Sequence, residues 1–473
     1  MKLLIIGIDG GDQRIFENME MPFVQSLLKN SNSLKCEEDL WSRGWVEILT
    51  GQPSTETGAV YTKPIFKGKE YRFSQSFKKA NYYDNPSLTP LWDLLSEAGL
   101  KIGMMNWPTT GPASKVNGFF VSGAGGGSGK SGSAEITVDA VYPKDIIQDL
   151  KDLDYIFDTR FKASNLVQFS KLMERLDKMQ ANRTESFIHL SKKFNVDVGL
   201  LCFRASTIVQ YLAMYDIESI IEGNDNSKER KLIKEFYRKF DNYLSNIFTQ
   251  INPDEFLIVS DHGSEPRKGT INLNQFLKEK DFLQFQPSFV QLLKRVINKI
   301  LVLSGKKSRF GLPISSKNTR AFTGRYISGI YINDRKRFNG SIDEGQIDSL
   351  VDEIVEVFNN YLPSQKHKLV ARPYRRNFMD SYFYDLLPDI WIDRPDPLFF
   401  EANGAFIEAN REYGPIKESL EEIKRDQHTG TKGRNPLFIC SNGIINTVLP
   451  NDKKDLTLAY KVISRFLNPT NSN

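Results

Sequence analysis

The chain has 473 residues, of which 40% are hydrophobic and 26% are charged, and its formal net charge is +5. These values are typical of a folded globular protein and exclude a disordered or collagen-like chain. A small positive charge spread over this length gives no reason to expect a nucleic-acid-binding protein. A chain of this length is too long for one simple core, so we expect two substructures.

Three cysteines, Cys36, Cys202 and Cys440, lie far apart in the sequence and show no metal-ligand spacing. An odd number of cysteines without a pairing pattern fits a reducing compartment. No signal peptide precedes the first apolar run, and no apolar run reaches the roughly 18 residues that a membrane-spanning helix requires. We therefore expect a cytoplasmic protein without a transmembrane segment, with peripheral membrane contact left open.

The first predicted element is a strand. Residues 3–8 form a short apolar run, which ends in Asp9-Gly10-Gly11. A continuous apolar run closed by glycines is typical of a strand buried on both faces of a parallel sheet. Open α/β sheets bind ligands beyond the carboxyl ends of their strands, so Asp9 is a candidate ligand-binding residue. The alternative is that Asp9 caps the next helix.

Helices and strands then alternate along the chain. A short helix ends at Gly51, and a strand is expected over residues 101–106. Further strands are expected over residues 197–203 and 255–259, and further helices over residues 15–29, 89–98, 160–195, 208–221 and 227–251. This alternation predicts a doubly wound α/β fold with a mostly parallel sheet and helices on both faces.

Residues 265–385 have a different pattern, with a basic segment at 294–309, a strand near 329–333 and a helix near 343–362. We interpret them as a smaller inserted α/β subdomain. The apolar runs 388–392 and 437–440 are expected to return to the main sheet. The predicted core therefore comprises residues 1–264 and 386–467, and the polar tail 468–473 is expected to be disordered.

Residues 124–131 look like a phosphate-binding P-loop. The strict pattern requires Gly where Ala124 stands, and it requires a helix directly after Ser131. The residues after Ser131 instead predict a turn and a strand. We expect a mobile glycine loop near a pocket and not a nucleotide-triphosphate site.

Ser260-Asp261-His262-Gly263 closes a strand in the way that Asp9 does. Two carboxylates and an imidazole at one edge of a sheet suit a divalent cation such as zinc, manganese or calcium. Taken alone, an Asp-His-Gly segment could also be a turn with a capping Asp. The two strand ends together favour a metal site made of Asp9, Asp261 and His262.

The order of these segments resembles the type I phosphodiesterase / nucleotide pyrophosphatase family of the alkaline phosphatase superfamily. The resemblance is carried by residues 8–11, 45–51, 89–99, 106–110, 117–123, 260–263, 330–333 and 388–390. It implies an alkaline-phosphatase-like fold and a hydrolase. It also implies that Asp9, Asp261 and His262 hold one of the two metal ions that the family uses.

The family's nucleophile, a Thr or Ser, lies just before the helix that ends here at Gly51. Strict spacing places it on Trp41, which cannot attack phosphorus, so the resemblance implies Ser42 with one residue deleted from the loop. The alternative is that Ser42 caps the helix. Arg43 and Asn106 are expected to help bind the substrate.

The second metal site departs from the family pattern. Ser206 and Gln210 stand where the family has Asp and His, and Lys432 stands where it has its last His; His428 lies four residues earlier. Ser and Gln are weak ligands and an ammonium repels a cation, so we expect one metal ion and doubt a second. Lys432 and Arg204 would replace its charge, a charge layout like that of the sulfatases. Gln210 and His428 are assigned to substrate binding.

Three hypotheses for the function follow. In the first, a metal-dependent hydrolase or transferase uses Ser42 to attack a phosphodiester, phosphonate or sulfate ester. In the second, the protein is a non-catalytic homologue that binds an anionic ligand or a partner. In the third, it is a two-metal phosphodiesterase whose second site uses His428 with Asp216 or Asp426. The expected substrate is a small anionic ester, and the oligomeric state is not predicted.

Overall fold

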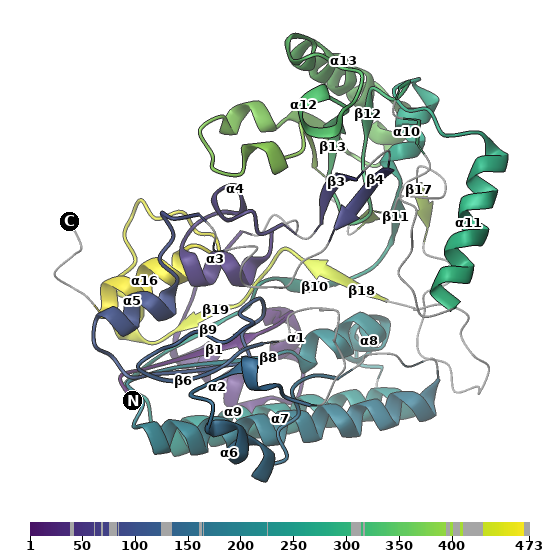
Figure 1. Ribbon diagram of the computed structural model, residues 1–473. Helices are drawn as coiled ribbons and strands as arrows, with labels where there is room; N and C mark the ends of the chain where they lie inside the picture. Colours follow the sequence, from purple (N-terminus) through teal and green to yellow (C-terminus); the bar gives the residue numbers. More distant parts are fainter. Residues whose placement is uncertain are drawn as a thin grey trace. The chain divides into compact units, whose positions relative to one another are not determined.

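Figure 1 shows the computed structural model of the chain. The structure describes residues 1–37, 42–60, 62–67, 70–74, 83, 85–123, 135–159, 163, 165–224, 226–303, 314–315, 317–393, 398–400, 407–409 and 429–467. The chain forms two compact units, of which unit 1 contains residues 1–59, 77–267 and 411–473 and unit 2 contains residues 60–76 and 268–410. The predicted glycine loop 124–131 and the predicted disordered tail 468–473 lie outside the described residues.

Unit 1 is built on an eight-stranded sheet with the strand order β2-β19-β9-β1-β8-β5-β6-β7. The strands are β1 (Leu3–Ile8), β2 (Asn32–Ser33), β5 (Ile102–Met105), β6 (Gly118–Val121), β7 (Val141–Tyr142), β8 (Val198–Phe203), β9 (Glu255–Val259) and β19 (Phe438–Cys440). The five strands from β9 to β6 are parallel, and β19, β2 and β7 run antiparallel to their neighbours. The predicted mostly parallel α/β sheet is confirmed.

The helices of unit 1 cover both faces of this sheet (Figure 1). One face is covered by α1 (Gln13–Asn18), α2 (Pro22–Asn30), α7 (Leu166–Phe194), α8 (Ala205–Ile221) and α9 (Lys228–Ile251). The other is covered by α3 (Gly44–Thr50), α5 (Leu91–Glu97), α15 (Asn442–Ile445) and α16 (Leu458–Leu467), and unit 1 also contains α4 (Ser54–Thr57) and α6 (Ile146–Asp152). The helix predicted over residues 15–29 is two helices, because Pro22 begins a new one and cannot continue the old one.

The central strand β1 shows why the sheet forms. All six of its residues are buried, and successive side chains point to opposite faces. Leu4 and Ile6 pack in one apolar core, and Leu3 and Ile5 pack in the other. β1 pairs in parallel with β8 on one side and with β9 on the other, so these three strands end at the same edge of the sheet.

Unit 2 contains an antiparallel four-stranded sheet with the order β12-β13-β15-β14, a three-stranded sheet with the order β16-β11-β17 and the hairpin β3-β4. The strands are β3 (Lys63–Lys67), β4 (Glu70–Ser74), β11 (Gly269–Ile271), β12 (Ala321–Phe322), β13 (Gly329–Ile332), β14 (Val370–Pro373), β15 (Ile390–Asp393), β16 (Leu398–Phe400) and β17 (Ile407–Ala409). The helices are α10 (Leu273–Glu279), α11 (Ser288–Leu303), α12 (Arg335–Phe338), α13 (Ile347–Asn359) and α14 (Leu362–Lys366).

The predicted boundaries of the smaller subdomain differ from those of unit 2. The prediction began at residue 265 and ended at residue 385, whereas unit 2 continues to residue 410 and also includes residues 60–76. The prediction that residues 388–392 return to the main sheet is wrong, because β15 pairs with β13 and β14. Ile390 and Ile392 are buried in the apolar core of unit 2, and a short apolar run does not specify which of two sheets it will join.

An antiparallel ribbon in unit 1 completes the frame of the site. It pairs β10 (Gly263–Pro266) with β18 (Gly430–Gly433), so that Ser264 lies opposite Lys432. Within the described parts of the chain, no helix is both long enough and apolar enough to cross a membrane.

Candidate metal centre and active site

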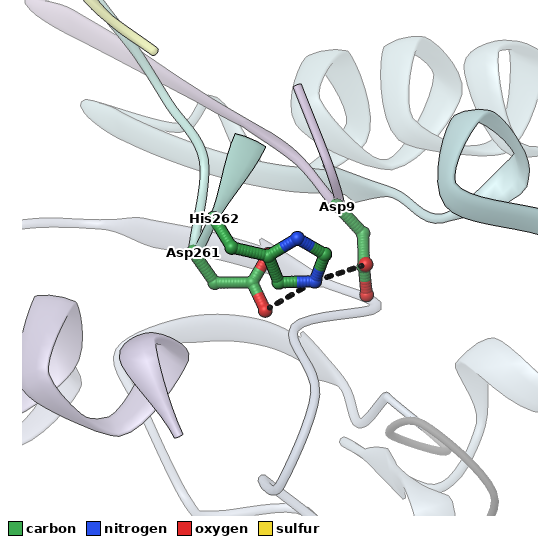
Figure 2. A group of neighbouring side chains, drawn as sticks. All are labelled: Asp9, Asp261 and His262. Atoms are coloured by element: carbon green, nitrogen blue, oxygen red, sulfur yellow. Dashed lines mark ion pairs between the residues drawn. The ribbon is translucent and has the colours of Figure 1, made fainter. Parts of the chain in front are cut away.

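Two neighbouring strands of unit 1 place two carboxyl groups and an imidazole close together at one edge of the sheet (Figure 2). Asp9 follows β1, and its backbone N–H donates a 2.8 Å hydrogen bond to the carbonyl of Phe203. Asp261 and His262 follow β9. Because β1 and β9 are parallel neighbours, their carboxyl ends bring these side chains together. We call Asp9, Asp261 and His262 the strand-end cluster.

The three side chains of the strand-end cluster converge on a common point. His262 Nε2 lies 3.6 Å from Asp9 Oδ1 and 3.5 Å from Asp261 Oδ2 (Figure 2). One ligand atom from each of the three residues lies within 4.8 Å of the other two. All three residues are buried.

The protonation state of His262 follows from its second ring nitrogen. Nδ1 lies 2.7 Å from the carbonyl oxygen of Gly263. A carbonyl oxygen can only accept, so Nδ1 carries the proton and donates it. Burial is the main cause that lowers the pKa of His262 to about 3, and the nearby charge of Lys432 adds to it. The imidazole is therefore neutral, and Nε2 presents a lone pair to the two carboxylates.

The two carboxyl groups are also perturbed. Burial, followed by repulsion from Asp261, raises the pKa of Asp9 to about 6. Burial raises the pKa of Asp261 to about 6, although the charge of Lys432 and a hydrogen bond from the backbone N–H of Gly10 oppose the shift. Two buried carboxylates this close together favour their protonated forms unless a cation lies between them.

This set of side chains fits a divalent metal ion. Two carboxylate oxygens and a neutral imidazole nitrogen are the ligands that zinc and manganese accept. The carbonyl contact at Nδ1 of His262 orients the ring and fixes the tautomer, as is common for metal-bound histidines. Within the part of the chain that the structure describes, this is the one group of at least three His, Cys, Asp or Glu residues with ligand atoms close enough to hold an ion.

Lys432 lies beside the strand-end cluster. Its Nζ is 4.0 Å from Asp261 Oδ2, and its side chain is only 14% exposed. The β10-β18 ribbon holds it there, because Lys432 pairs with Ser264, two residues after His262. The structure therefore brings this predicted residue to the predicted metal ligands, as a cation in partly buried surroundings.

Ser42 and Arg43 lie just before α3. Arg43 is the N-cap residue of α3. Ser42 is therefore not the helix cap that the alternative interpretation proposed. Ser42 is fully buried, and its hydroxyl donates a 2.8 Å hydrogen bond to Oγ of Ser54. Trp41, on which strict spacing falls, lies outside the described residues.

The start of α3 packs against the strand-end cluster. A Cβ atom on Gly44 would lie 2.7 Å from the carbonyl oxygen of Asp261 and 3.1 Å from its Cα, so only glycine allows this approach. The charge of Arg43 lowers the pKa of Asp261. Ser42 therefore lies two residues from a close backbone contact with Asp261 of the strand-end cluster.

Arg204 precedes α8 and is buried beside Asp158. Its Nη1 donates a 2.8 Å hydrogen bond to Asp158 Oδ1. The charge of Arg204 also lowers the pKa of Asp9, so the guanidinium lies near the strand-end cluster. Because Asp158 offsets this charge, Arg204 contributes less net positive charge to the site than was predicted.

Asn106 follows β5 at the same edge of the sheet and has a φ of 67°, a left-handed conformation that Asn tolerates better than most residues. Its Nδ2 donates a 3.3 Å hydrogen bond to the carbonyl of Cys202, and its Oδ1 accepts a 3.2 Å hydrogen bond from the Tyr155 hydroxyl. Both ends of the amide thus have protein partners, and its predicted role in substrate binding stays a prediction.

The residues at the second-site positions are engaged in the protein frame. The hydroxyl of Ser206 donates a 2.7 Å hydrogen bond to the carbonyl of Asp9. Oε1 of Gln210 accepts a 2.7 Å hydrogen bond from Ser264, and its Nε2 donates to the Tyr237 hydroxyl at 3.3 Å. Both residues are fully buried. The geometry therefore assigns Gln210 to the support of the strand ends and gives its predicted contact with substrate no support.

The remaining candidates for a second site are not brought to the cluster by the described structure. Asp216 lies on α8, 3.5 Å from Nε of Arg230. His428 and Asp426 lie outside the described residues.

Three residues near the site were missed by sequence reasoning. Asp158 pairs with Arg204, Ser54 bonds Ser42, and Tyr211 stacks on His262 with ring centroids 6.4 Å apart and planes 14° apart. None of them belongs to a motif. Tyr211 had the clearest signal, because it directly follows Gln210 on a helix expected at the site.

Comparisons with known proteins agree with this architecture. A family model described as type I phosphodiesterase / nucleotide pyrophosphatase matches residues 3–405. No curated protein sequence matches the chain.

Among solved structures, phosphonoacetate hydrolase from Sinorhizobium meliloti 1021 in complex with phosphonoformate has a TM-score of 0.55 and 13% sequence identity. That match covers 98% of this chain and 95% of the hydrolase. Murine ectonucleotide pyrophosphatase / phosphodiesterase 5 has a TM-score of 0.49 and 13% identity, covering 99% of this chain and 95% of the murine chain. At such low identity the hydrolase match shows the fold.

Proposed function

Because the chain belongs to the type I phosphodiesterase / nucleotide pyrophosphatase family, a family of hydrolases in the alkaline phosphatase superfamily, we propose that it hydrolyses phosphodiester-type bonds with one divalent metal ion. Asp9, Asp261 and His262 would hold that ion. The alternative of a non-catalytic homologue has less support, since the family match spans most of the chain and the strand-end cluster is complete.

One observation carries the metal assignment. At the centre of the strand-end cluster, Asp9 Oδ1, Asp261 Oδ2 and His262 Nε2 face one another. All three atoms are acceptors when the proton of His262 is on Nδ1, which donates a hydrogen bond to the carbonyl of Gly263. Such an arrangement in a buried place is unfavourable unless a cation occupies the centre. Zinc or manganese suits these ligands best, and calcium would prefer more oxygens.

A divalent ion bound there supplies Lewis-acid stabilisation of negative charge and lowers the pKa of a hydroxyl that binds to it. In the proposed reaction, Oγ of Ser42 forms a bond to phosphorus as the bond from phosphorus to the leaving oxygen breaks. The hydroxyl of Ser42 loses its proton and the departing oxygen gains one. Water then releases the esterified Ser42, or an alcohol does so if the enzyme is a transferase.

Ser54 is proposed to position the nucleophile. Its hydroxyl lies 2.8 Å from Oγ of Ser42. Its backbone N–H donates to Oε1 of Glu47 at 3.2 Å, which ties the segment to α3. A hydroxyl at this distance can donate to Ser42 once Ser42 has lost its proton.

Lys432 is proposed to bind the non-bridging oxygens of the substrate. The carboxylates of Asp9 and Asp261 and the ammonium of Lys432 together carry one negative charge, and a divalent ion would change this to one positive charge. Before the charge of Arg43 is added, these groups and the ion carry one positive charge, which suits a monoanion such as a phosphodiester, a phosphonate monoester or a sulfate ester. It suits a dianionic phosphate monoester less well.

Arg43 is proposed to help bind the same oxygens, because its charge lowers the pKa of Asp261. Arg204 and Asn106 are proposed to support the site through their hydrogen bonds, Arg204 to Asp158 and Asn106 to the carbonyl of Cys202. His428 remains a proposed substrate-binding residue on sequence position. The smaller contribution of Arg204, paired with Asp158, makes Lys432 the main replacement for a second ion.

The first test is the metal content of the purified protein, measured by elemental analysis without chelator and compared with Asp261→Asn. About one divalent ion per chain, lost in the variant, is the expected result. Two ions per chain would instead support the two-metal hypothesis. The absence of bound metal even after addition of zinc, manganese or calcium would contradict the metal assignment.

The second test is activity against aryl phosphodiester, phosphonate, sulfate and phosphate monoester substrates. We expect the diester to be cleaved faster than the monoester, and Ser42→Ala to abolish cleavage while it retains the metal. Ser54→Ala is the matched control, because it removes the other partner of the same hydrogen bond. The activity of this variant should fall only about tenfold, as expected for a positioning residue. A fully active Ser42→Ala variant would exclude Ser42 as the nucleophile.

A further inference from the structure

The helix α11 of unit 2, labelled in Figure 1, presents an apolar face to solvent. Five large apolar side chains on it are between 48% and 72% exposed: Phe289, Leu292, Leu293, Val296 and Ile300. The last four lie three, four, seven and eleven residues after Phe289. This spacing places them along one side of a helix.

Such a face is unusual for a surface helix. A helix with an apolar stripe normally packs that stripe against a core, because removing it from water is the main source of its stability. Large apolar side chains are exposed elsewhere in the described structure, but no other described helix carries more than one of them. Contiguous apolar surface of this kind marks an interaction site.

The charge of the surrounding segment indicates the partner. Residues 282–333 contain no Asp or Glu. The same residues contain nine basic ones: Lys294, Arg295, Lys299, Lys306, Lys307, Arg309, Lys317, Arg320 and Arg325. Lys299 is exposed on α11 itself, and Lys294 is partly exposed. An apolar face in a segment whose charges are all positive fits a partner surface with negative charges on the outside and an apolar layer directly under them.

We propose that α11 binds the surface of an anionic lipid bilayer, with its apolar face in the interfacial region and its lysines near the headgroups. A helix of this length is about 24 Å long, at roughly 1.5 Å per residue, and its charged residues keep it parallel to the surface. A second copy of the chain is a poorer occupant, because two copies would bring the same positive charges together. This surface belongs to unit 2, whereas the strand-end cluster belongs to unit 1, and the proposal does not depend on the proposed reaction.

The test is co-sedimentation of the full chain with lipid vesicles. Vesicles with about 30% phosphatidylglycerol in phosphatidylcholine are compared with pure phosphatidylcholine at low salt. We expect binding to the anionic vesicles, weakened at least tenfold in Phe289→Asp/Leu293→Asp. Leu362→Asp is the matched control, because Leu362 is 76% exposed in the same unit but lies outside the acid-free segment. Circular dichroism checks that all variants are folded.

A second pair of measurements tests the charge. Lys294→Gln/Lys299→Gln should weaken binding to anionic vesicles. A salt concentration of about 1 M should also weaken binding, because it screens the attraction between the lysines and the lipid headgroups. Equal binding to neutral and anionic vesicles, or binding that the apolar variant retains, would overturn the proposal. So would failure of the wild type to bind. A dimer in sedimentation velocity that Phe289→Asp/Leu293→Asp dissociates, without vesicle binding, would assign the face to a second copy.

Discussion

Two buried charged clusters in this molecule differ in how their charges are compensated. In unit 2, Asp334, Arg337, Arg375 and Asp389 form the arginine cluster, beside a cavity of about 490 Å³. Oδ1 of Asp389 accepts a 2.7 Å hydrogen bond from Arg375, and its Oδ2 accepts from Arg337 at 2.6 Å and from a backbone N–H at 2.7 Å. The carboxylate of Asp334 accepts hydrogen bonds from the backbone N–H and from the side chain of Arg337.

The strand-end cluster in unit 1 lacks this matching. Its two carboxylates face a neutral imidazole, and the ammonium of Lys432 stays 4.0 Å away from Asp261. Where donors and acceptors match, buried charges support the fold by themselves. Where carboxylate oxygens and an imidazole nitrogen converge, as in the strand-end cluster, a bound cation would supply positive charge at their centre. The predictions below test this contrast.

The largest effect is expected in the arginine cluster. Asp389→Asn should lower the free energy of unfolding by about 3 kcal/mol, because it leaves Arg337 and Arg375 buried without their shared carboxylate. Denaturant titration measures this loss. Metal content should not change, since the strand-end cluster lies in unit 1. A variant as stable as the wild type would show that the arginine cluster is not a structural core.

A smaller effect is expected at Lys432. Lys432→Gln should lower kcat/KM for a diester by about 30-fold, which is about 2 kcal/mol, because it removes a cation from the developing negative charge. Metal affinity should stay the same or rise, since an ammonium near Asp261 repels the ion. Lys432→Arg should recover part of the activity. A loss of metal in Lys432→Gln would indicate a structural role instead.

The stability of the metal-free protein should depend on pH at the strand-end cluster. The pKa values of Asp9 and Asp261 are raised to about 6 from 3.8, so the folded state holds more protons than the unfolded state between these values. The stability from the two carboxyl groups is full below about pH 4 and is lost as pH rises through 6. His262, whose pKa is lowered from 6.5 to about 3, has the opposite effect between those two values, so the net loss is on the order of 1 kcal/mol.

Thermal unfolding of chelator-treated protein at pH 5 and pH 7.5 measures this dependence. Asp261→Asn is the control. It should remove the loss of stability that this carboxyl group contributes as pH rises and stabilise the metal-free protein at pH 7.5, opposite in sign to Asp389→Asn. Added zinc should raise the melting temperature more at pH 7.5 than at pH 5, because protons compete with the ion. An equal zinc effect at both pH values would contradict the assigned ligands.

The smallest effect is expected at Ser206. Ser206→Ala removes the 2.7 Å hydrogen bond to the carbonyl of Asp9 and should cost about 1 kcal/mol of stability. Activity should fall only a few-fold if Ser206 supports the frame. A drop of a thousandfold, with loss of a second ion, would show that Ser206 is a ligand and that the two-metal hypothesis is right.

The strand-end cluster was predictable from the sequence because its signals are local. An apolar run ended by Asp9, and another ended by Asp261 and His262, are complete patterns within a few residues each. The rule that parallel strands end at a common edge then brings them together without knowledge of the rest of the fold. The substitution of Ser206 and Gln210 was visible for the same reason, since both lie in one segment next to a strand.

What the tertiary structure alone decided depends on contacts between distant segments. The apolar run of β15 was recognisable, but its sheet depends on β13 and β14. The pairing of Arg204 with Asp158 joins residues from separate elements, and it changed the charge assigned to the site. The basic character of α11 was evident in the sequence, whereas its uncovered apolar face was not, because burial depends on what the rest of the chain places against it.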